Sequence, residues 1–364
     1  SMSLTRRSFS LLTAAGLGLG VAFGAFSASA ADKVKAAFVY VGPVGDFGWS
    51  YQHNQGRLSL EKHFGDKVET TFVESVAEGA DAERVIRSLA QKGNDIIFTT
   101  SFGYMNPTIK VAKQFPKVKF EHATGYKRSK NVATYLSRTY EGRYITGYLA
   151  AKMSKTGTAG YIASFPIPEV IRDINAVTLG MQSVRPDMKM KIIWVNTWMD
   201  PGKEAAAAKV LVSQDVDVII QHTDSPAAMQ VAQKEKIWAV GQATDMTAFG
   251  PDAHLTAVID EWGPYYIKRV QMVMDGTWKS SDHWGGMPEG DIVMGPIHAK
   301  VPAEAKAHAE KLVAGITNGT FHPFTGPISN QAGKVIVPAG KTMSDGELAG
   351  MNWYVKGVEG SIPK

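Results

Sequence analysis

The chain has 364 residues, of which 44% are hydrophobic and 20% are charged, and its formal net charge is +5. This composition is typical of a globular protein, and the length suggests two domains rather than one core. Because there is no cysteine, disulfides, thiolate zinc sites and a cysteine nucleophile are excluded. The mild charge, without a Lys/Arg run, argues against a nucleic-acid partner.

Residues 1–30 have the pattern of a secretory signal peptide. Arg6 and Arg7 precede an apolar run over residues 11–26, which is shorter than the ~20 residues that a membrane span needs. The small residues after this run end at Ala30 and match an Ala-x-Ala cleavage site. The order Thr-Arg-Arg-Ser-Phe resembles a twin-arginine signal, with a Sec signal or a membrane anchor as alternatives. Cleavage would leave a net charge of +3, and we expect a periplasmic protein.

Strand and helix patterns alternate along the rest of the chain. The first half predicts strands at 34–41, 68–76, 95–100, 117–123 and 132–137, with helices at 49–64, 80–92 and from Asn106 onward. The second half predicts strands at 158–164, 190–195, 216–222, 237–240 and 255–259, with helices at 143–153, 169–184, 204–214, 226–235 and 265–274. An extended stretch at 291–298, a helix at 303–316 and a strand at 334–338 complete the chain.

This alternation predicts an α/β fold with two Rossmann-like lobes, each built on a parallel sheet. We expect residues 31–138 plus about 263–290 in lobe I, and residues 139–262 plus about 291–364 in lobe II. No low-complexity linker separates the lobes, which favours a hinge of several strands. Two such lobes in an exported chain are typical of type I periplasmic binding proteins, which close around a ligand.

The usual catalytic motifs are missing from the sequence. It contains no P-loop, no dinucleotide fingerprint, no His-Glu-x-x-His and no Gly-x-Ser-x-Gly. The nine histidines are scattered, and we interpret His122 and His222 as structural. We therefore expect no enzyme, no metal site and no cofactor.

Aromatic and polar side chains instead gather just after the predicted strands. In parallel sheets these loops meet at one edge, where ligands bind, and rings with a few polar groups are typical of a small-molecule site. For single residues the alternative is plain packing; Phe47 and Trp49, for example, could staple the first helix to its sheet. The candidate ligand-binding residues are Asp46, Phe47, Trp49, Phe102, Tyr104, Asn106, Phe165, Asp224, Asp245 and Trp262.

Three stretches, GDFGWSYQHNQG, SFGYMNPTIKVAKQFPKVKF and EGRYITGYLAAKMSKTGTAGYIASFPIPEV, carry a family resemblance. In this order they resemble the basic membrane protein family, the substrate-binding proteins of ABC importers, some of which bind purine nucleosides. The resemblance covers nearly all of the chain after residue 30. It implies two Rossmann-like lobes, a small-molecule ligand in the cleft and delivery to an inner-membrane ABC permease. We also expect a monomer.

Three departures from the family pattern bear on the ligand. Asn106 stands where the family usually has an aspartate that reads the purine edge, and an amide, which donates and accepts, complements adenine. Ala243 and Asp260 stand where nucleoside binders keep an Asp and a Lys for the ribose, although a small shift would bring Asp245 into register. We therefore expect a free purine base, adenine. The alternatives are a nucleoside-binding protein of the same class, a sensor partner of a membrane receptor, or an exported nucleoside hydrolase-like enzyme.

Overall fold

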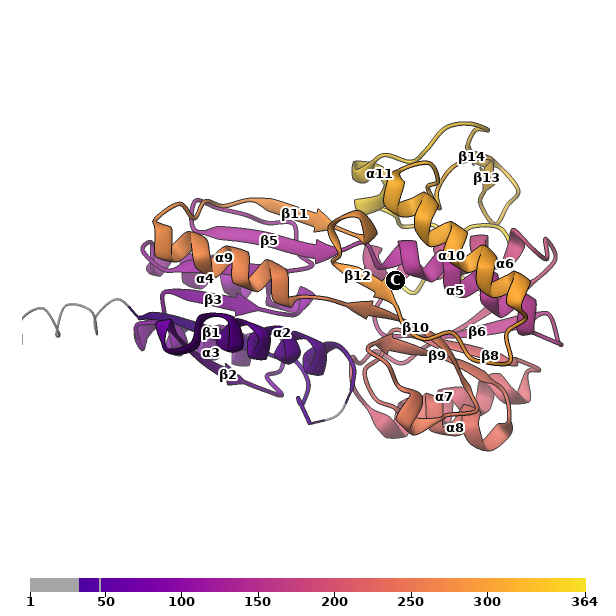
Figure 1. The fold of residues 1–364 in the computed structure, drawn as a ribbon, viewed down its shortest axis with the longest axis horizontal. Helices are drawn as coiled ribbons and strands as arrows, with labels where there is room; N and C mark the ends of the chain where they lie inside the picture. Colours follow the sequence, from indigo (N-terminus) through magenta and orange to yellow (C-terminus); the bar gives the residue numbers. More distant parts are fainter. Residues whose placement is uncertain (1–32, 46) are drawn as a thin grey trace, which may run out of the picture.

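A computed structural model describes residues 33–45 and 47–364, so the predicted signal peptide and Asp46 lie outside the described residues. Within these residues the chain forms two α/β lobes that lie side by side (Figure 1). Each lobe is built on a six-stranded, mostly parallel sheet, as the alternating strand and helix patterns predict. No helix in the described part of the chain is long and apolar enough to cross a bilayer.

The sheet of the first lobe has the strand order β11-β5-β4-β3-β1-β2, and all its pairs are parallel. Apolar side chains make these strands suitable for burial on both faces, and β3 is buried at every position. Its strands are β1 Val34–Val39, β2 Val68–Val73, β3 Ile96–Thr99, β4 Lys119–Ala123, β5 Val132–Ser137 and β11 Asp282–Gly285.

Four helices cover this sheet, namely α2 Trp49–Phe64, α3 Ala80–Gln91, α4 Met105–Gln114 and α9 Gly263–Asp275. Helix α3 buries Ile86, Leu89 and Ala90, and this confirms the apolar face that their spacing predicts. Helix α9 comes from the second half of the chain yet packs beside α2 (Figure 1). The first lobe is therefore discontinuous in sequence.

The sheet of the second lobe has the order β12-β10-β9-β8-β6-β7 and is parallel except at β12, which runs antiparallel to β10. Strand β9 continues three residues beyond the predicted strand at 237–240, which places Gln242 at the end of the sheet. The strands are β6 Thr158–Ala163, β7 Lys189–Trp194, β8 Val218–Gln221, β9 Trp238–Ala243, β10 His254–Asp260 and β12 Ile292–Met294.

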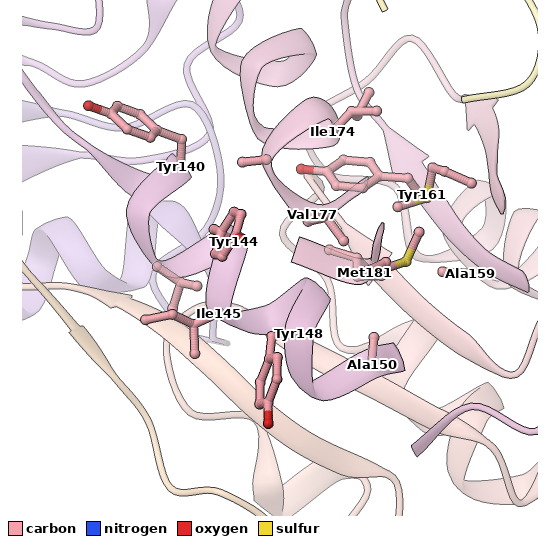
Figure 2. Packing of buried hydrophobic residues seen from close by; sticks show 14 of the residues in the cluster. Tyr140, Tyr144, Ile145, Tyr148, Ala150, Ala159, Tyr161, Ile174, Val177 and Met181 are labelled. Carbon is pink, nitrogen blue, oxygen red and sulfur yellow. The ribbon is translucent and has the colours of Figure 1, made fainter. Parts of the chain in front are cut away.

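The helices of this lobe are α5 Thr139–Met153, α6 Pro168–Gln182, α7 Pro201–Ser213, α8 Ala227–Glu235 and α10 Ala303–Asn318. Helices α5 and α6 make the tightest pair, because a methyl group on Gly147 or Gly180 would overlap the backbone of the facing helix. Figure 2 shows Tyr144 and Val177 in the buried cluster around this contact. Helix α5 begins four residues before the predicted helix at 143–153, which places Arg143 in its second turn.

The chain ends in a cap on the second lobe, formed by the short strands β13 Ile328–Ser329 and β14 Val335–Val337 and by helix α11 Asp345–Ala349. Asn175 of α6 binds this segment through a hydrogen bond from its Nδ2 to the Trp353 carbonyl (2.8 Å). The cap therefore packs on α6 of the second lobe.

The chain passes between the two sheets three times: from β5 to α5, from β10 to α9, and from β11 to β12. Asp260 ties the first two passages together, since its Oδ1 accepts a hydrogen bond from Ser137 Oγ (2.7 Å). This is the expected multi-strand hinge. We propose lobe boundaries at these passages, with residues 31–138 and about 263–290 in lobe I, and the rest of the chain after residue 30 in lobe II.

Candidate ligand-binding site

A cleft lies where the carboxyl ends of both sheets face each other. Loops that follow parallel strands supply most of its walls, as in other open α/β sheets. Three aromatic rings and several polar groups share the lining, and both lobes contribute to it. The lining residues are Val41, Trp49, Ser101, Phe102 and Thr124 from the first lobe and Glu169, Trp198, His222, Asp224 and Gln242 from the second.

Trp49 is held rigidly at the first turn of α2. Its Nε1–H donates to the Thr100 carbonyl (2.5 Å). Its ring meets His53 and Trp262 edge to face, with centroids 4.4 and 5.6 Å away. A ring fixed in this way offers a flat apolar surface to a ligand at little entropic cost.

The other two rings of the cleft are tied together by Glu78. Its Oε1 accepts a hydrogen bond from Trp198 Nε1 across the cleft (3.2 Å). Its Oε2 accepts from Ser101 Oγ (2.7 Å) and from the Gly103 amide (2.6 Å), on either side of Phe102. Glu78 thus fixes the turn that carries Phe102 and links it to the second lobe.

Asp224 supplies a buried carboxyl group. Its Oδ1 accepts from the Trp49 amide (3.1 Å), a contact between the lobes. Its Oδ2 is buried and has no hydrogen-bond partner among the described residues. Burial raises the pKa of Asp224 to about 8, with the Trp49 amide acting in the opposite direction and Glu204 adding to the rise. The free oxygen is therefore available to a ligand.

Glu169 and His222 form the second polar corner. His222 Nε2 lies 3.8 Å from Glu169 Oε1, and His222 Nδ1 is 2.7 Å from the Tyr161 hydroxyl. Burial would raise the pKa of Glu169, but His222 and the neighbouring Arg172 outweigh it and hold the pKa below its usual value. Glu169 is thus an ionised acceptor.

Gln242 completes the polar set from the end of β9. Its side chain is buried, and Arg143 Nη2 donates to its Oε1. No group of three or more His, Cys, Asp or Glu that could hold a metal occurs within residues 33–45 and 47–364.

The structure brings three of the candidate residues, Trp49, Phe102 and Asp224, into the cleft lining. Phe165 lies behind the lining, with its ring centroid 5.2 Å from that of Trp198. Phe47 packs instead against the second lobe, where its ring meets Phe249 at 5.1 Å. Its position favours a role in holding the lobes together.

Tyr104 and Asn106 lie outside the lining. Tyr104 is fully buried in the first lobe, and its hydroxyl donates to the Val76 carbonyl (2.5 Å). Asn106 is exposed, and its Oδ1 accepts from Lys127 Nζ (2.8 Å). Both follow β3, but the turn Phe102–Tyr104 directs only Phe102 into the cleft.

Asp245 and Trp262 are also outside it. Asp245 is half exposed and accepts from the amide (2.9 Å) and hydroxyl (2.5 Å) of Thr247. Trp262 is buried at the second passage between lobes and stacks on His53, with ring centroids 4.5 Å apart. It supports Trp49 from behind. Asp46 lies outside the described residues.

Several lining residues had no place among the candidates, notably Glu169, Trp198, His222 and Gln242. Trp198 and Gln242 occur at or after strand ends, so the rule that selected the other candidates could have found them. Glu169 lies in the first turn of α6, and only the packing of that helix shows that it faces the cleft.

Comparison with known proteins agrees with this architecture. The family model described as "ABC transporter substrate-binding protein PnrA-like" (Bmp) matches residues 33–315. A solute-binding protein of an ABC transporter system from Aeropyrum pernix K1 has the same fold, with a TM-score of 0.70 at 19% identity over 82% of this chain and 93% of that one.

Two sequence relatives cover nearly the whole chain. One, named a purine-binding protein of Brucella abortus (strain 2308), is 57% identical over 97% of this chain and 99% of its own length. The other, named a putative ABC transporter glucose-binding protein of Haloferax volcanii, is 37% identical over 92% of this chain and 83% of its own. The family model and the sequence relatives agree that this is a binding protein and not an enzyme. The chain belongs to the Bmp family of PnrA-like ABC transporter substrate-binding proteins.

Proposed function

We propose that this protein binds a free purine base, adenine, in the cleft between its lobes and delivers it to an ABC permease in the inner membrane. The observation that carries the proposal is the make-up of the cleft. Aromatic rings wall it, and an Asp224 carboxyl oxygen that has no partner among the described residues borders it together with the Gln242 NH₂. A planar heterocycle with a donor beside an acceptor matches this arrangement.

The hydrogen-bonding groups of the cleft support adenine. Adenine presents an amino donor next to a ring-nitrogen acceptor. Asp224 Oδ2 can accept from the amino group, and the NH₂ of Gln242 can donate to a ring nitrogen. We therefore assign to Asp224 and Gln242 the recognition that the sequence suggests for Asn106, because Asn106 is exposed and bound to Lys127.

The absence of a ribose clamp at two positions supports a base rather than a nucleoside. Ala243 has no polar side chain, and the Asp260 carboxyl is buried in the hinge on Ser137 Oγ. Neither residue belongs to the cleft lining, so neither is placed to bind ribose hydroxyls.

The names of the two sequence relatives support a purine ligand and also suggest the main alternative, a sugar. The Brucella relative at 57% identity is named for purine binding, whereas the Haloferax relative at 37% is named for glucose. A sugar needs many hydrogen-bonding groups, while this cleft offers several rings, which favours the purine.

The test is a side-by-side calorimetric titration with adenine, adenosine, guanine, guanosine and glucose. We expect adenine to bind tightest, and adenosine at least ~100-fold more weakly, because two ribose hydroxyls left unpaired cost about 1–3 kcal/mol each. If adenosine binds as tightly as adenine, the assignment of a free base is wrong, but the assignment to purine transport still holds. Tight glucose binding without adenine binding would overturn the purine assignment.

We also propose that the protein acts in the periplasm as a monomer after cleavage of residues 1–30. The signal-like pattern at Arg6, Arg7 and the small residues before Ala30 supports export. Intact-mass measurement of periplasmic protein, from cells with the native sequence and with Arg6→Lys plus Arg7→Lys, gives the cleavage site and the route. Loss of export in the double variant would indicate the twin-arginine route, and unchanged export would indicate Sec.

A further inference from the structure

Arg143 contacts Gln242 from beneath the cleft. It lies in the second turn of α5, is only 2% exposed, and is not part of the cleft lining. Its Nη2 donates to the Gln242 Oε1 and to the Gln221 carbonyl oxygen, the latter at 2.9 Å. Arg143 therefore bonds directly to a residue of the cleft lining, Gln242, without belonging to the lining itself.

This contact determines which way the Gln242 amide faces. A guanidinium group has donors only, so the amide atom against Arg143 must be the oxygen. The NH₂ then points away from Arg143, and no described residue accepts a hydrogen bond from it, although Gln242 lines the cleft. The neighbouring Gln221 differs, because its NH₂ donates to the carbonyls of Thr223 (2.6 Å) and Ser225 (2.9 Å).

Packing alone gives a weak account of Arg143. Its Nε lies 3.6 Å from Asp173 Oδ2, and neither Nε nor Nη1 has a hydrogen-bond partner among the described residues. Arg143 compensates the buried Asp173 charge, but an apolar pair at these two positions would often be at least as stable, and the ion pair leaves two buried donors of Arg143 without partners among the described residues. An apolar side chain, however, could not orient Gln242.

We propose that Arg143 is a positioning residue that sets the hydrogen-bonding polarity of the cleft. It holds the Gln242 NH₂ toward the ligand and so selects ligands with an acceptor at that point. This inference rests on the proposed function, in which the acceptor is a ring nitrogen of adenine. Without Arg143, the amide can turn by 180° and present either its oxygen or its NH₂.

The experiment compares adenine with 1-, 3- and 7-deazaadenine, each of which replaces one ring nitrogen by C–H. Wild-type protein should bind one of the three about tenfold or more weakly than adenine, which corresponds to the loss of one hydrogen bond of ~1.4 kcal/mol. In Gln242→Met the affinity ratio between adenine and this analogue should fall to about one. The analogue whose ratio falls identifies the nitrogen that Gln242 contacts.

In Arg143→Met the same ratio should fall to within about threefold, because the amide is no longer oriented. Arg143→Lys should retain it, since an ammonium also donates to Oε1. Arg84→Met is the matched control, because this arginine is 73% exposed and pairs with Asp81 on the surface. This variant should show the same affinity ratio between adenine and the deaza analogue as the wild type. A merely structural role of Arg143 would lower stability without altering the ratio.

If Arg143→Met is folded and keeps the wild-type affinity ratio between adenine and the deaza analogue, the proposal for Arg143 is wrong. The assignment of adenine as the ligand would be unaffected. A wild-type ratio near one for all three analogues, with adenine bound, would also overturn the proposal for Arg143. Failure of the wild type to bind adenine would overturn the proposed function itself. If circular dichroism shows Arg143→Met unfolded, Arg143→Gln replaces it, because that amide can face either atom of Gln242 and should likewise relax the ratio.

Discussion

At the scale of single residues, the Asp224 carboxyl group has two roles: one oxygen contacts the other lobe, and the second is left for a ligand in the cleft. One oxygen accepts from the Trp49 amide of the other lobe, and the second is buried without a described partner. Burial raises its pKa to about 8. A proton therefore competes with any ligand group that needs an acceptor at this oxygen.

This competition predicts a pH-dependent affinity. Below pH 8 the free carboxyl is largely protonated, and the adenine amino group requires the ionised form. Adenine affinity should therefore rise with pH from 5 to 8, by up to about tenfold per unit, and level off above 8. Titrations across this range measure the slope, and Asp224→Asn should remove it. A flat profile in the wild type would mean that Asp224 does not accept from the ligand.

The rings of the cleft give a second prediction at this scale. Replacing Trp49 or Phe102 by Ala should weaken adenine binding by about one to two decades, since a stacked aromatic face contributes roughly 1–3 kcal/mol. Phe165→Ala should have a smaller effect, because Phe165 reaches the cleft only through Trp198. Calorimetry on the three variants decides this, and parent-like affinity in both Trp49→Ala and Phe102→Ala would refute stacking.

At the scale of elements, the start of α2 determines how closely the lobes approach. Gly48 precedes this helix with φ at +116°, a conformation that side chains rarely adopt. A Cβ there would lie 2.5 Å from the Asp224 carbonyl oxygen of the other lobe. Only glycine at position 48 allows the first residue of α2, Trp49, to bring its amide within reach of Asp224.

Gly48→Ala should therefore hold the lobes apart. We expect an intact fold but adenine affinity lower by about 100-fold or more, because Trp49 and Asp224 no longer meet across the cleft. Gly45→Ala is the matched control, since nothing lies within 4 Å of a Cβ there and its φ is not positive. Near-parental affinity of Gly48→Ala in calorimetry would show that closure does not need this contact.

At the scale of the whole molecule, side chains connect the lobes around the cleft as well as through the hinge. Trp198 bonds to Glu78, and Phe47 packs on Phe249. These contacts belong to a closed arrangement, and a hinge of three chain passages allows the lobes to separate.

Adenine should shift this equilibrium toward closure. The radius of gyration from solution scattering should fall at saturating adenine, and the melting temperature should rise with ligand concentration. Glu78→Gln is an informative variant: its single amide oxygen cannot accept from both Trp198 Nε1 and the Gly103 amide, so the closed arrangement should be weakened. A scattering profile that does not change when bound adenine is verified separately would indicate a rigid pocket.

Alternating strand and helix patterns were sufficient to predict the two-lobed α/β fold, because each element is specified by residues close together in sequence. The same strand-end rule selected Trp49, Phe102 and Asp224, since parallel strands present their carboxyl ends at one edge. Family resemblance came from short ordered stretches and was confirmed by the family model.

Tertiary structure decided which of the strand-end side chains face the cleft. Tyr104 and Asn106 follow the same strand as Phe102, yet one is buried and the other exposed, because a single helical turn rotates them to different sides. Contacts between distant segments, such as Arg143 with Gln242, have no local signature at all. They arise only when helix α5 packs beneath the sheet, so sequence pattern could indicate where a ligand binds but not which atoms would recognise it.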